Sequence, residues 1–183
     1  MSSVSIQGNA SGTGIFTIAS PNSNTNRTLT LPDNTGTVIT TGSTFGSTGP
    51  AFRAHLSTTQ TISTGVVTKY AAATEVFDTN SCYDTTLYRF TPNVAGYYKI
   101  GFGNWWDSLT GVSNARIYKN GSATLTRYEY SSGGSTQTID GVLYMNGTTD
   151  YVELYVEQVS GSNQNLNSSS VQPGFFGYMV RSA

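Results

Sequence analysis

The chain has 183 residues, of which only 10% are charged, and its formal net charge at pH 7 is −1. This length accommodates one domain, or one domain with an appendage. The nine lysine and arginine residues are spread singly along the chain, so no basic stripe is available to bind nucleic acid or an anionic membrane surface.

Small polar residues dominate the composition. Gly, Ser, Thr and Asn together number 85, and chains rich in these residues stay disordered when they carry too few large apolar side chains to offset chain entropy. Here aromatic residues make up 12% of the chain, and they fall in short strand-like runs. We therefore expect a folded all-β protein with polar turns.

The N-terminal residues give no sign of export or membrane insertion. The first ten residues lack the basic stretch and the apolar stretch that a secretory signal peptide requires. No apolar run approaches the roughly 20 residues needed to cross a bilayer. We expect a chain that is made in a cytoplasm and is not inserted into a membrane.

Residues 1–41 form a segment with its own character. Three short apolar pieces are separated by turn-forming residues at 21–26 and 32–36, which predicts three brief strands. A segment with so few large apolar side chains cannot form an independent core. We therefore expect residues 1–41 to be an arm that depends on partners, most simply on copies of itself. Residues 42–50 are rich in Gly, Ser and Thr and end in a proline, which is the composition of a flexible linker.

Residues 51–183 carry a sustained alternation of apolar and polar side chains. At 151–159, Val152, Leu154 and Val156 point to one face, while the tyrosines and glutamates between them point to the other. Similar runs recur through this part of the chain, and none shows the period of a helix. The pattern predicts an all-β domain, hence a sandwich, a jelly roll or a barrel.

Three patterns within this domain predict particular strands. At 86–102, two aromatic-rich runs flank a turn containing Pro, Asn and Gly, which predicts two neighbouring strands of an antiparallel sheet. Asn120 and Gly121 separate two further runs and predict a hairpin. The run at 175–180 is apolar on both faces, as expected of a strand that is buried on both sides.

Cys82 is the one cysteine of the chain, so no internal disulfide can form. We expect it to be a small buried apolar residue, which is how a free cysteine commonly behaves. A nucleophilic role would require a partner histidine, and nothing in the sequence brings the single histidine, His55, to it.

The carboxylates give little support for catalysis or metal binding. Glu153 and Glu157 share a strand face, but four residues separate them by about 13 Å, too far for the paired acids of a glycosidase, so both are expected to face solvent. Asp78 and Asp84 offer oxygen ligands for calcium, but no dense Asp/Asn/Gly loop surrounds them. We expect neither a metal nor a cofactor, and no catalytic residue is assigned.

Trp105, Trp106 and Asp107 form the best candidate for a binding site. Indole faces stack on sugar rings, tryptophan is favoured in binding hot spots, and the adjacent carboxylate offers a polar contact. We therefore assign these three residues to receptor binding. The alternative is that at least one of the two tryptophans lies in the core or at a subunit interface.

Several pieces of residues 51–183 occur in an order found in one known family. They are AFRAHLS, FDTNSCYDTTLYRFTPNVAGYYKIGF, ARIYKNGS, the run at 151–159 and PGFFGYMV. With these pieces the domain resembles the jelly roll shared by the complement globular head and the tumour necrosis factor superfamily. The resemblance implies a ten-stranded sandwich that packs into a three-fold trimer, with loops at the apex contacting ligands. The match departs at 104–114 and 122–138, so no ligand specificity is carried over from those parts.

The tyrosines and the low charge also favour self-association. Tyrosine supplies a large contact area with a polar tip and is enriched where protein surfaces meet. The alternation places several tyrosines on outward or intersubunit faces, where a monomeric sandwich would more often carry charged side chains. The residues that we expect at the trimer interface are Tyr98, Tyr151, Tyr155, Phe176 and Tyr178.

The N-terminal arm shows a second resemblance. GTGIFTIASPNSNTNRTLTLPDNTGTVITT at 12–41 is similar to a short repeat-like unit of bacteriophage tail fibres and other virion appendages. The resemblance implies a homotrimeric virion protein of the tail-fibre type, made in the host cytoplasm. Its arm would join other virion proteins, and its knob would attach to a host-surface glycan or protein receptor. The alternatives are a capsid-decorating, cement or head-fibre protein, and a polysaccharide-degrading enzyme, for which the chain lacks the length and the paired acids.

Overall fold

A computed structural model describes residues 10–15, 17, 22–26, 28 and 49–183. The chain divides into two units, Met1–Val38 and Ile39–Ala183, and each is considered by itself. In the first unit the described residues are exposed and form no helix or strand. The remaining residues of the three brief strands predicted at 1–41 lie outside the described residues. Most of the linker predicted at 42–50 lies outside them too.

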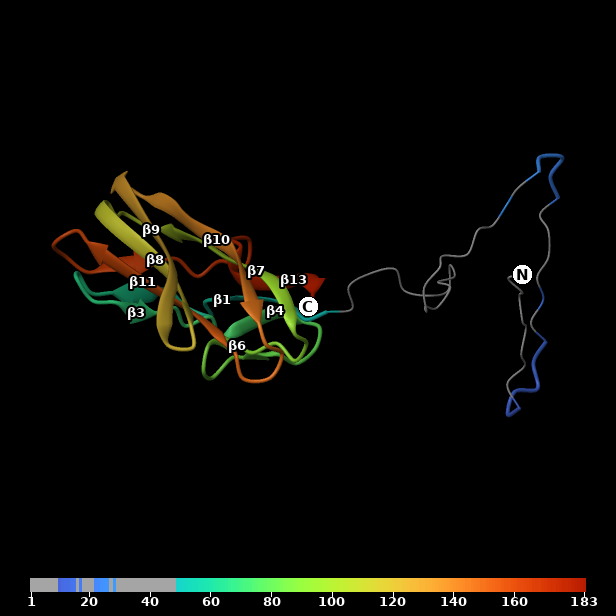
Figure 1. Cartoon of the computed structure of the whole chain (residues 1–183). Helices are drawn as coiled ribbons and strands as arrows, with labels where there is room; N and C mark the ends of the chain where they lie inside the picture. The colour runs from blue at the N-terminus through green and yellow to red at the C-terminus, as the bar shows by residue number, and fades with distance from the viewer. Residues whose placement is uncertain (1–9, 16, 18–21, 27, 29–48) are drawn as a thin grey trace. The chain divides into compact units, whose positions relative to one another are not determined.

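Residues 49–183 form an all-β domain in which the structure describes no helix (Figure 1), as the sequence predicted. Ten of its strands have three or more residues, whereas β3, β5 and β6 have two each. The strands are β1 (Ala51–His55), β2 (Gln60–Ile62), β3 (Thr68–Lys69), β4 (Thr74–Asp78), β5 (Tyr83–Asp84), β6 (Arg89–Phe90), β7 (Gly96–Trp106), β8 (Thr110–Lys119), β9 (Ser122–Ser132), β10 (Ser135–Met145), β11 (Val152–Val159), β12 (Gln164–Leu166) and β13 (Gly174–Ser182).

The strands form two sheets. In sheet A, β10 pairs with one edge of β7, and β13, β1 and β4 follow in that order on the other side, while β12 and β2 continue the sheet at the end of β7. Sheet B has the order β5, β6, β11, β8, β9, with β3 also paired to β11. All pairings between these strands are antiparallel, and many neighbours are distant in sequence, as in a jelly-roll sandwich.

The core lies between the two sheets and follows the alternation of side chains along the strands. On β11, Val152, Leu154 and Val156 are fully buried, as their spacing predicted. The ring of Phe52 on β1 stacks on that of Phe90 on β6, with centroids 4.4 Å apart. This contact joins sheet A to sheet B across the middle of the sandwich.

The pattern at 86–102 does not form the two neighbouring strands that the sequence predicted. Phe90 belongs to β6 in sheet B, whereas Tyr98 belongs to β7 in sheet A. The residues at 91–95 cross from one sheet to the other, a gap of roughly 10 Å between packed sheets, instead of folding back in a tight turn. The two rings therefore meet across the core, with centroids 5.8 Å apart.

The hairpin predicted at Asn120 and Gly121 is confirmed. Lys119 on β8 pairs with Ser122 on β9, so only these two residues remain in the turn. Their φ angles are 53° and 79°, the left-handed conformation that a two-residue hairpin turn requires and that Asn and Gly adopt most readily.

Both ends of the described domain lie at one end of the sandwich (Figure 1). The backbone N–H of Met179 donates to the carbonyl of Pro50, and that of Ala183 donates to the carbonyl of Ala95, each at 3.1 Å. We call this the proximal end. The opposite, distal end is formed by the connections at 107–109, 133–134, 160–163 and 167–173.

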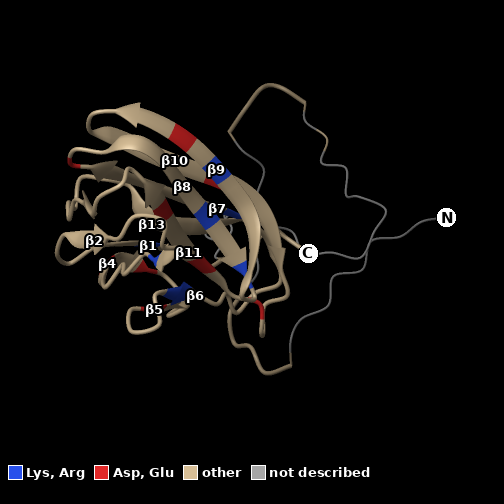
Figure 2. Cartoon of the chain, turned by 90° about the vertical axis from the view of Figure 1, so that its left-hand side faces the viewer, with Lys and Arg blue, Asp and Glu red and all other residues tan. Residues whose placement is uncertain are grey.

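Charged residues are sparse on the domain, and Figure 2 shows neither sign gathered on one face. Among the residues that the structure describes, no helix could cross a membrane. Cys82 is buried, as expected, and its burial raises the pKa of the thiol.

Candidate functional site

The outward face of sheet A carries an unusual number of exposed apolar side chains. Because side chains alternate along a strand, the residues between the core positions of β7, β10 and β13 point away from the sandwich. Register pairing places Tyr97 opposite Tyr144, and Lys99 opposite both Val142 and Tyr178. We call this the aromatic face, and its residues are Tyr97, Lys99, Asp140, Val142, Tyr144, Phe176 and Tyr178.

Contacts within the aromatic face hold its rings in place. Tyr97 and Tyr144 meet edge to face, with ring centroids 5.6 Å apart. The ring of Phe176 lies across Gly101, where any larger side chain would collide with it. Tyr178 remains 45% exposed and Val142 56% exposed. The result is a broad, largely apolar surface on one side of the domain.

The aromatic face also accounts for the apolar run at 175–180. The sequence predicted a strand buried on both sides, and in β13 Phe175 is indeed fully buried in the core. On the other side of the same strand, Tyr178 and Val180 are exposed in the single chain. A second chain packed on the aromatic face would complete the burial that the pattern predicts.

Tyr98 was expected at the trimer interface, and this assignment is wrong. Its side chain is fully buried, and its hydroxyl donates to the carbonyl of Val94 at 2.7 Å. Tyr98 follows the same alternation as Ile100 and Phe102, which places all three in the core.

The other four residues expected at the interface lie on two opposite faces. Phe176 and Tyr178 belong to the aromatic face of sheet A. Tyr151 directly precedes β11 of sheet B, and Tyr155 lies on the outward side of that strand. The Tyr151 ring lies 3.8 Å from the guanidinium carbon of Arg89, so it is already engaged within its own chain.

Glu153 was expected to face solvent, but the structure buries it beneath an ion network. Its Oε1 is 2.8 Å from the Lys69 amine and 2.7 Å from the Arg89 guanidinium, and its Oε2 accepts from the Tyr155 hydroxyl at 3.2 Å. Burial opposes the ionisation of Glu153, but the hydrogen bonds and charges of Lys69 and Arg89 outweigh it, so the pKa is lowered. Glu157 was also expected to face solvent, but its side chain is only 16% exposed and pairs with Arg116.

Acid should weaken the domain through Glu153. Because its folded pKa lies below its ordinary value of 4.5, the stability it contributes is present above that pH and is lost as the pH falls through the lowered pKa. Glu153→Gln should therefore cost about 1.5–3 kcal/mol at pH 7 and flatten the loss of stability below pH 4.5, as measured by urea unfolding. The exposed Glu75→Gln is the control. An unchanged acid profile in Glu153→Gln would contradict this assignment.

The proposed receptor-binding residues separate in the structure. Trp106 is fully buried, and its indole N–H donates to Oε1 of Gln137 at 3.2 Å, so its assignment to receptor binding is wrong. Trp105 points outward and is 38% exposed at the distal end. Asp107 follows it, and its Oδ1 accepts from the Asn167 amide at 2.9 Å. Asn167 was not predicted, because nothing in the sequence indicates its proximity.

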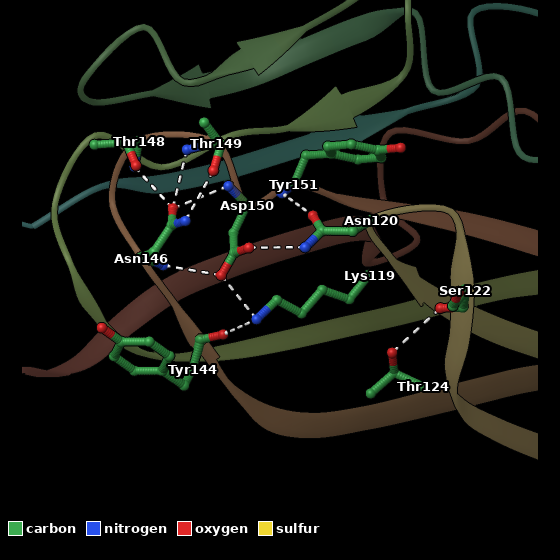
Figure 3. Close-up of polar contacts among 10 residues, drawn as sticks. All are labelled: Lys119, Asn120, Ser122, Thr124, Tyr144, Asn146, Thr148, Thr149, Asp150 and Tyr151. Atoms are coloured by element: carbon green, nitrogen blue, oxygen red, sulfur yellow. Dashed lines mark hydrogen bonds and ion pairs between the residues drawn. The ribbon is translucent and has the colours of Figure 1, made fainter.

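A dense polar network fixes the proximal loops (Figure 3). Asp150 accepts from the Asn120 amide at 2.7 Å and from the Asn146 backbone N–H at 3.0 Å, and it pairs with Lys119 at 2.8 Å. Burial opposes the ionisation of Asp150, but these partners stabilise the carboxylate and lower its pKa. The Asn146 side chain in turn accepts three backbone N–H groups of its own loop. The network is complete within the chain, which indicates a structural role.

Asp78 and Asp84, considered above as calcium ligands, act in turns. Asp78 accepts from the backbone N–H groups of Asn80 and Tyr83, and Asp84 accepts from those of Thr86 and Leu87. In the part of the chain that the structure describes, no three His, Cys, Asp or Glu side chains converge as a metal site would require.

No family model matches the chain, and no curated protein matches it. Solved structures do. The globular domain of zebrafish complement 1qA protein is 16% identical, with a TM-score of 0.55 over 74% of this chain and 99% of that chain. Eiger TNF from S. frugiperda is 9% identical, with a TM-score of 0.57 over 74% and 93% of the two chains. PRD1 vertex protein P5 is 15% identical, with a TM-score of 0.54 over 74% and 99%.

Identities this low establish the fold and nothing further. The strand order, the two-sheet core and these likenesses agree with the resemblance found in the sequence. The all-β domain of this chain has the jelly-roll fold of complement globular-head and TNF-like domains.

Proposed function

We propose that this protein is a non-enzymatic structural protein of a phage virion, of the tail-fibre type. Its knob, residues 51–183, forms a homotrimer and attaches the particle to a glycan or protein on the host surface. The observation that carries the trimeric knob is the aromatic face, which a monomer would have little reason to expose, and the virion setting rests on the resemblance of residues 12–41 to tail-fibre units.

The trimer places the aromatic face of each knob near the three-fold axis. Burial of apolar surface there favours association by about 25 cal/mol per Å². The face also contains Lys99 and Asp140, whose charged groups lie 3.1 Å apart. Because these two charges pair within one chain, less free energy is needed to remove them from water when a second chain packs on the face. A closed three-fold ring uses two different patches on each subunit, so the aromatic face contacts another part of its neighbour.

The N-terminal segment supplies the connection to the particle in this proposal. Residues 1–41 would be the attachment arm and 42–50 the linker, on the strength of their composition and their resemblance to tail-fibre units. The chain reaches the knob at Pro50, which is at the proximal end. The distal end therefore lies farthest from this tether along the sandwich.

The distal end is the proposed attachment surface. It carries the exposed ring of Trp105 and the carboxylate of Asp107, which Asn167 orients. Three copies engaging at once raise the overall avidity, so weak single contacts suffice.

Free trimer should compete with the phage for its host cells. Trp105→Ala should keep the sedimentation of the trimer but lower its ability to block adsorption by about tenfold, because one aromatic contact is lost in each subunit. Val171→Ala, at another exposed distal position, is the control. If Trp105→Ala blocks adsorption as well as the unaltered trimer, the attachment surface lies elsewhere on the knob.

The second candidate function is capsid decoration or a head-fibre role. It is favoured by the likeness in fold to PRD1 vertex protein P5. A decorating protein should change the resistance of the capsid to heat or salt and should be present in many dozens of copies, whereas a fibre should be present in a few trimers. A polysaccharide-degrading enzyme is the third class. It would release reducing ends from host polysaccharide, and Asp107→Ala would abolish that release.

A further inference from the structure

The outward face of sheet B carries a second surface, distinct from the aromatic face. Asn114 on β8 pairs in register with Tyr128 on β9 on one side and with Glu157 on β11 on the other. Arg116 follows on the same face of β8, and Tyr130 follows on the same face of β9. We call these five residues the tyrosine face.

Two tyrosine rings project from the edge of this face. Tyr128 is 67% exposed and Tyr130 is 71% exposed. They are two residues apart on one side of a strand, so their side chains leave the backbone about 7 Å from each other. β9 is the last strand of sheet B, so these rings border solvent on the side away from β8.

The side-chain oxygen of Asn114 is a buried hydrogen-bond acceptor without a partner, and Asn114 lies in register between Tyr128 and Glu157. Asn114 is 4% exposed, and its Nδ2 donates to Oε2 of Glu157 at 2.9 Å. Since only the amide nitrogen can donate to a carboxylate, this bond fixes the orientation of the amide. The Asn114 Oδ1 is left with no hydrogen-bond partner within the chain. This oxygen is itself covered, so a donor on a ligand would reach it only after the side chains over it move aside.

The charges of the tyrosine face indicate an uncharged ligand. The Glu157 carboxylate accepts from the Arg116 guanidinium, so the two charges neutralise each other. An anionic or a cationic ligand would have to compete with this pair. Neutral sugars combine apolar C–H faces with many hydroxyl donors, which matches rings bordering a row of fixed polar atoms.

We infer that the tyrosine face is a lateral binding site for a neutral oligosaccharide. The rings of Tyr128 and Tyr130 stack on the C–H faces of sugar units. Sugar hydroxyls donate to Glu157 and, once the side chains over it move aside, to the Asn114 Oδ1, and the remaining N–H groups of Arg116 donate to sugar oxygens. In the proposed trimer, sheet A faces the axis and sheet B faces outward, so three such sites remain accessible. The inference rests on the proposed attachment function for its biological setting.

Calorimetric titration of the full-length protein with maltohexaose, cellohexaose and mannohexaose tests the inference. We expect millimolar to micromolar binding of at least one of these neutral oligosaccharides. Tyr128→Ser should lower the affinity about tenfold or more, whereas Tyr128→Phe, which keeps the ring, should bind as the unaltered protein does. Phe77→Ser, which removes an exposed ring from β4 in the other sheet, should leave this binding unchanged.

Three results would overturn the inference. One is the absence of binding to all three oligosaccharides. Another is binding that Trp105→Ala abolishes and Tyr128→Ser does not, which would move the sugar site to the distal end. The third is dissociation of the trimer by Tyr128→Ser in sedimentation, which would make the tyrosine face a contact between subunits. A failure of the proposed function can be told apart from a failure of this inference. If only the proposed function is wrong, the protein is monomeric or does not block adsorption, but its sugar binding still depends on Tyr128.

Discussion

Val142→Lys is expected to convert the proposed trimer into monomers at micromolar concentration. The new ammonium would lie opposite Lys99 in the β7–β10 register and beside a contact that the proposed trimer covers. Lys99 belongs to the same chain, so the cost on association comes from covering an unpaired ammonium, which is several kcal/mol, and about 3 kcal/mol corresponds to roughly a hundredfold increase in the dissociation constant. Sedimentation velocity measures the change directly. The monomer itself should remain folded, because Val142 is 56% exposed within one chain.

Val159→Lys is the matched control for this experiment. Val159 has nearly the same exposure, 52%, but lies at the end of β11 on sheet B. It should sediment as the unaltered trimer does. If both variants remain trimers, the aromatic face is not the contact between subunits. If the unaltered chain is already a monomer at this concentration, the trimer itself is refuted.

Trp106→Ala is expected to destabilise the domain by about 3–5 kcal/mol, the usual cost of removing a buried tryptophan. The indole is fully buried at the distal end of β7, so its removal leaves a large cavity. It also removes the donor to Oε1 of Gln137, which is itself fully buried. Urea unfolding followed by circular dichroism would give the loss in free energy of unfolding.

The adjacent Trp105 provides the control. Trp105→Ala removes the same side chain from the outward face of the same strand and should cost less, about 1–2 kcal/mol, because Trp105 is 38% exposed whereas Trp106 is fully buried. Equal losses in the two variants would show that the inward and outward sides of β7 have been assigned wrongly.

The alternation of side chains was sufficient to predict the all-β class and most of the core. The same signal could have corrected two assignments made from the sequence. Extending the alternation of Tyr98, Ile100 and Phe102 by four residues places Trp106 in the core. Tyr98 and Trp106 were instead selected for their residue type, which is informative only after the side of the strand is known.

Other features could not be predicted from the sequence, because they depend on contacts between distant strands. The crossing at 91–95 looks like a turn in one sheet, since local residue types do not reveal which sheet each strand joins. The approach of Asn167 to Asp107 links two loops that are 60 residues apart. The pairing of Arg116 with Glu157 depends on the register between β8 and β11, which only the folded sheet defines.

The location of Pro50 at the proximal end has a mechanical consequence. In the proposed function, a particle that pulled on residues 42–50 while the distal end held a cell would load β1 along its length. Because β1 is bonded to β13 on one side and β4 on the other, and antiparallel hydrogen bonds run perpendicular to the strands, these bonds would share the force at once. Such shear loading resists rupture better than unzipping bonds one by one, so the knob is well suited to withstand tension.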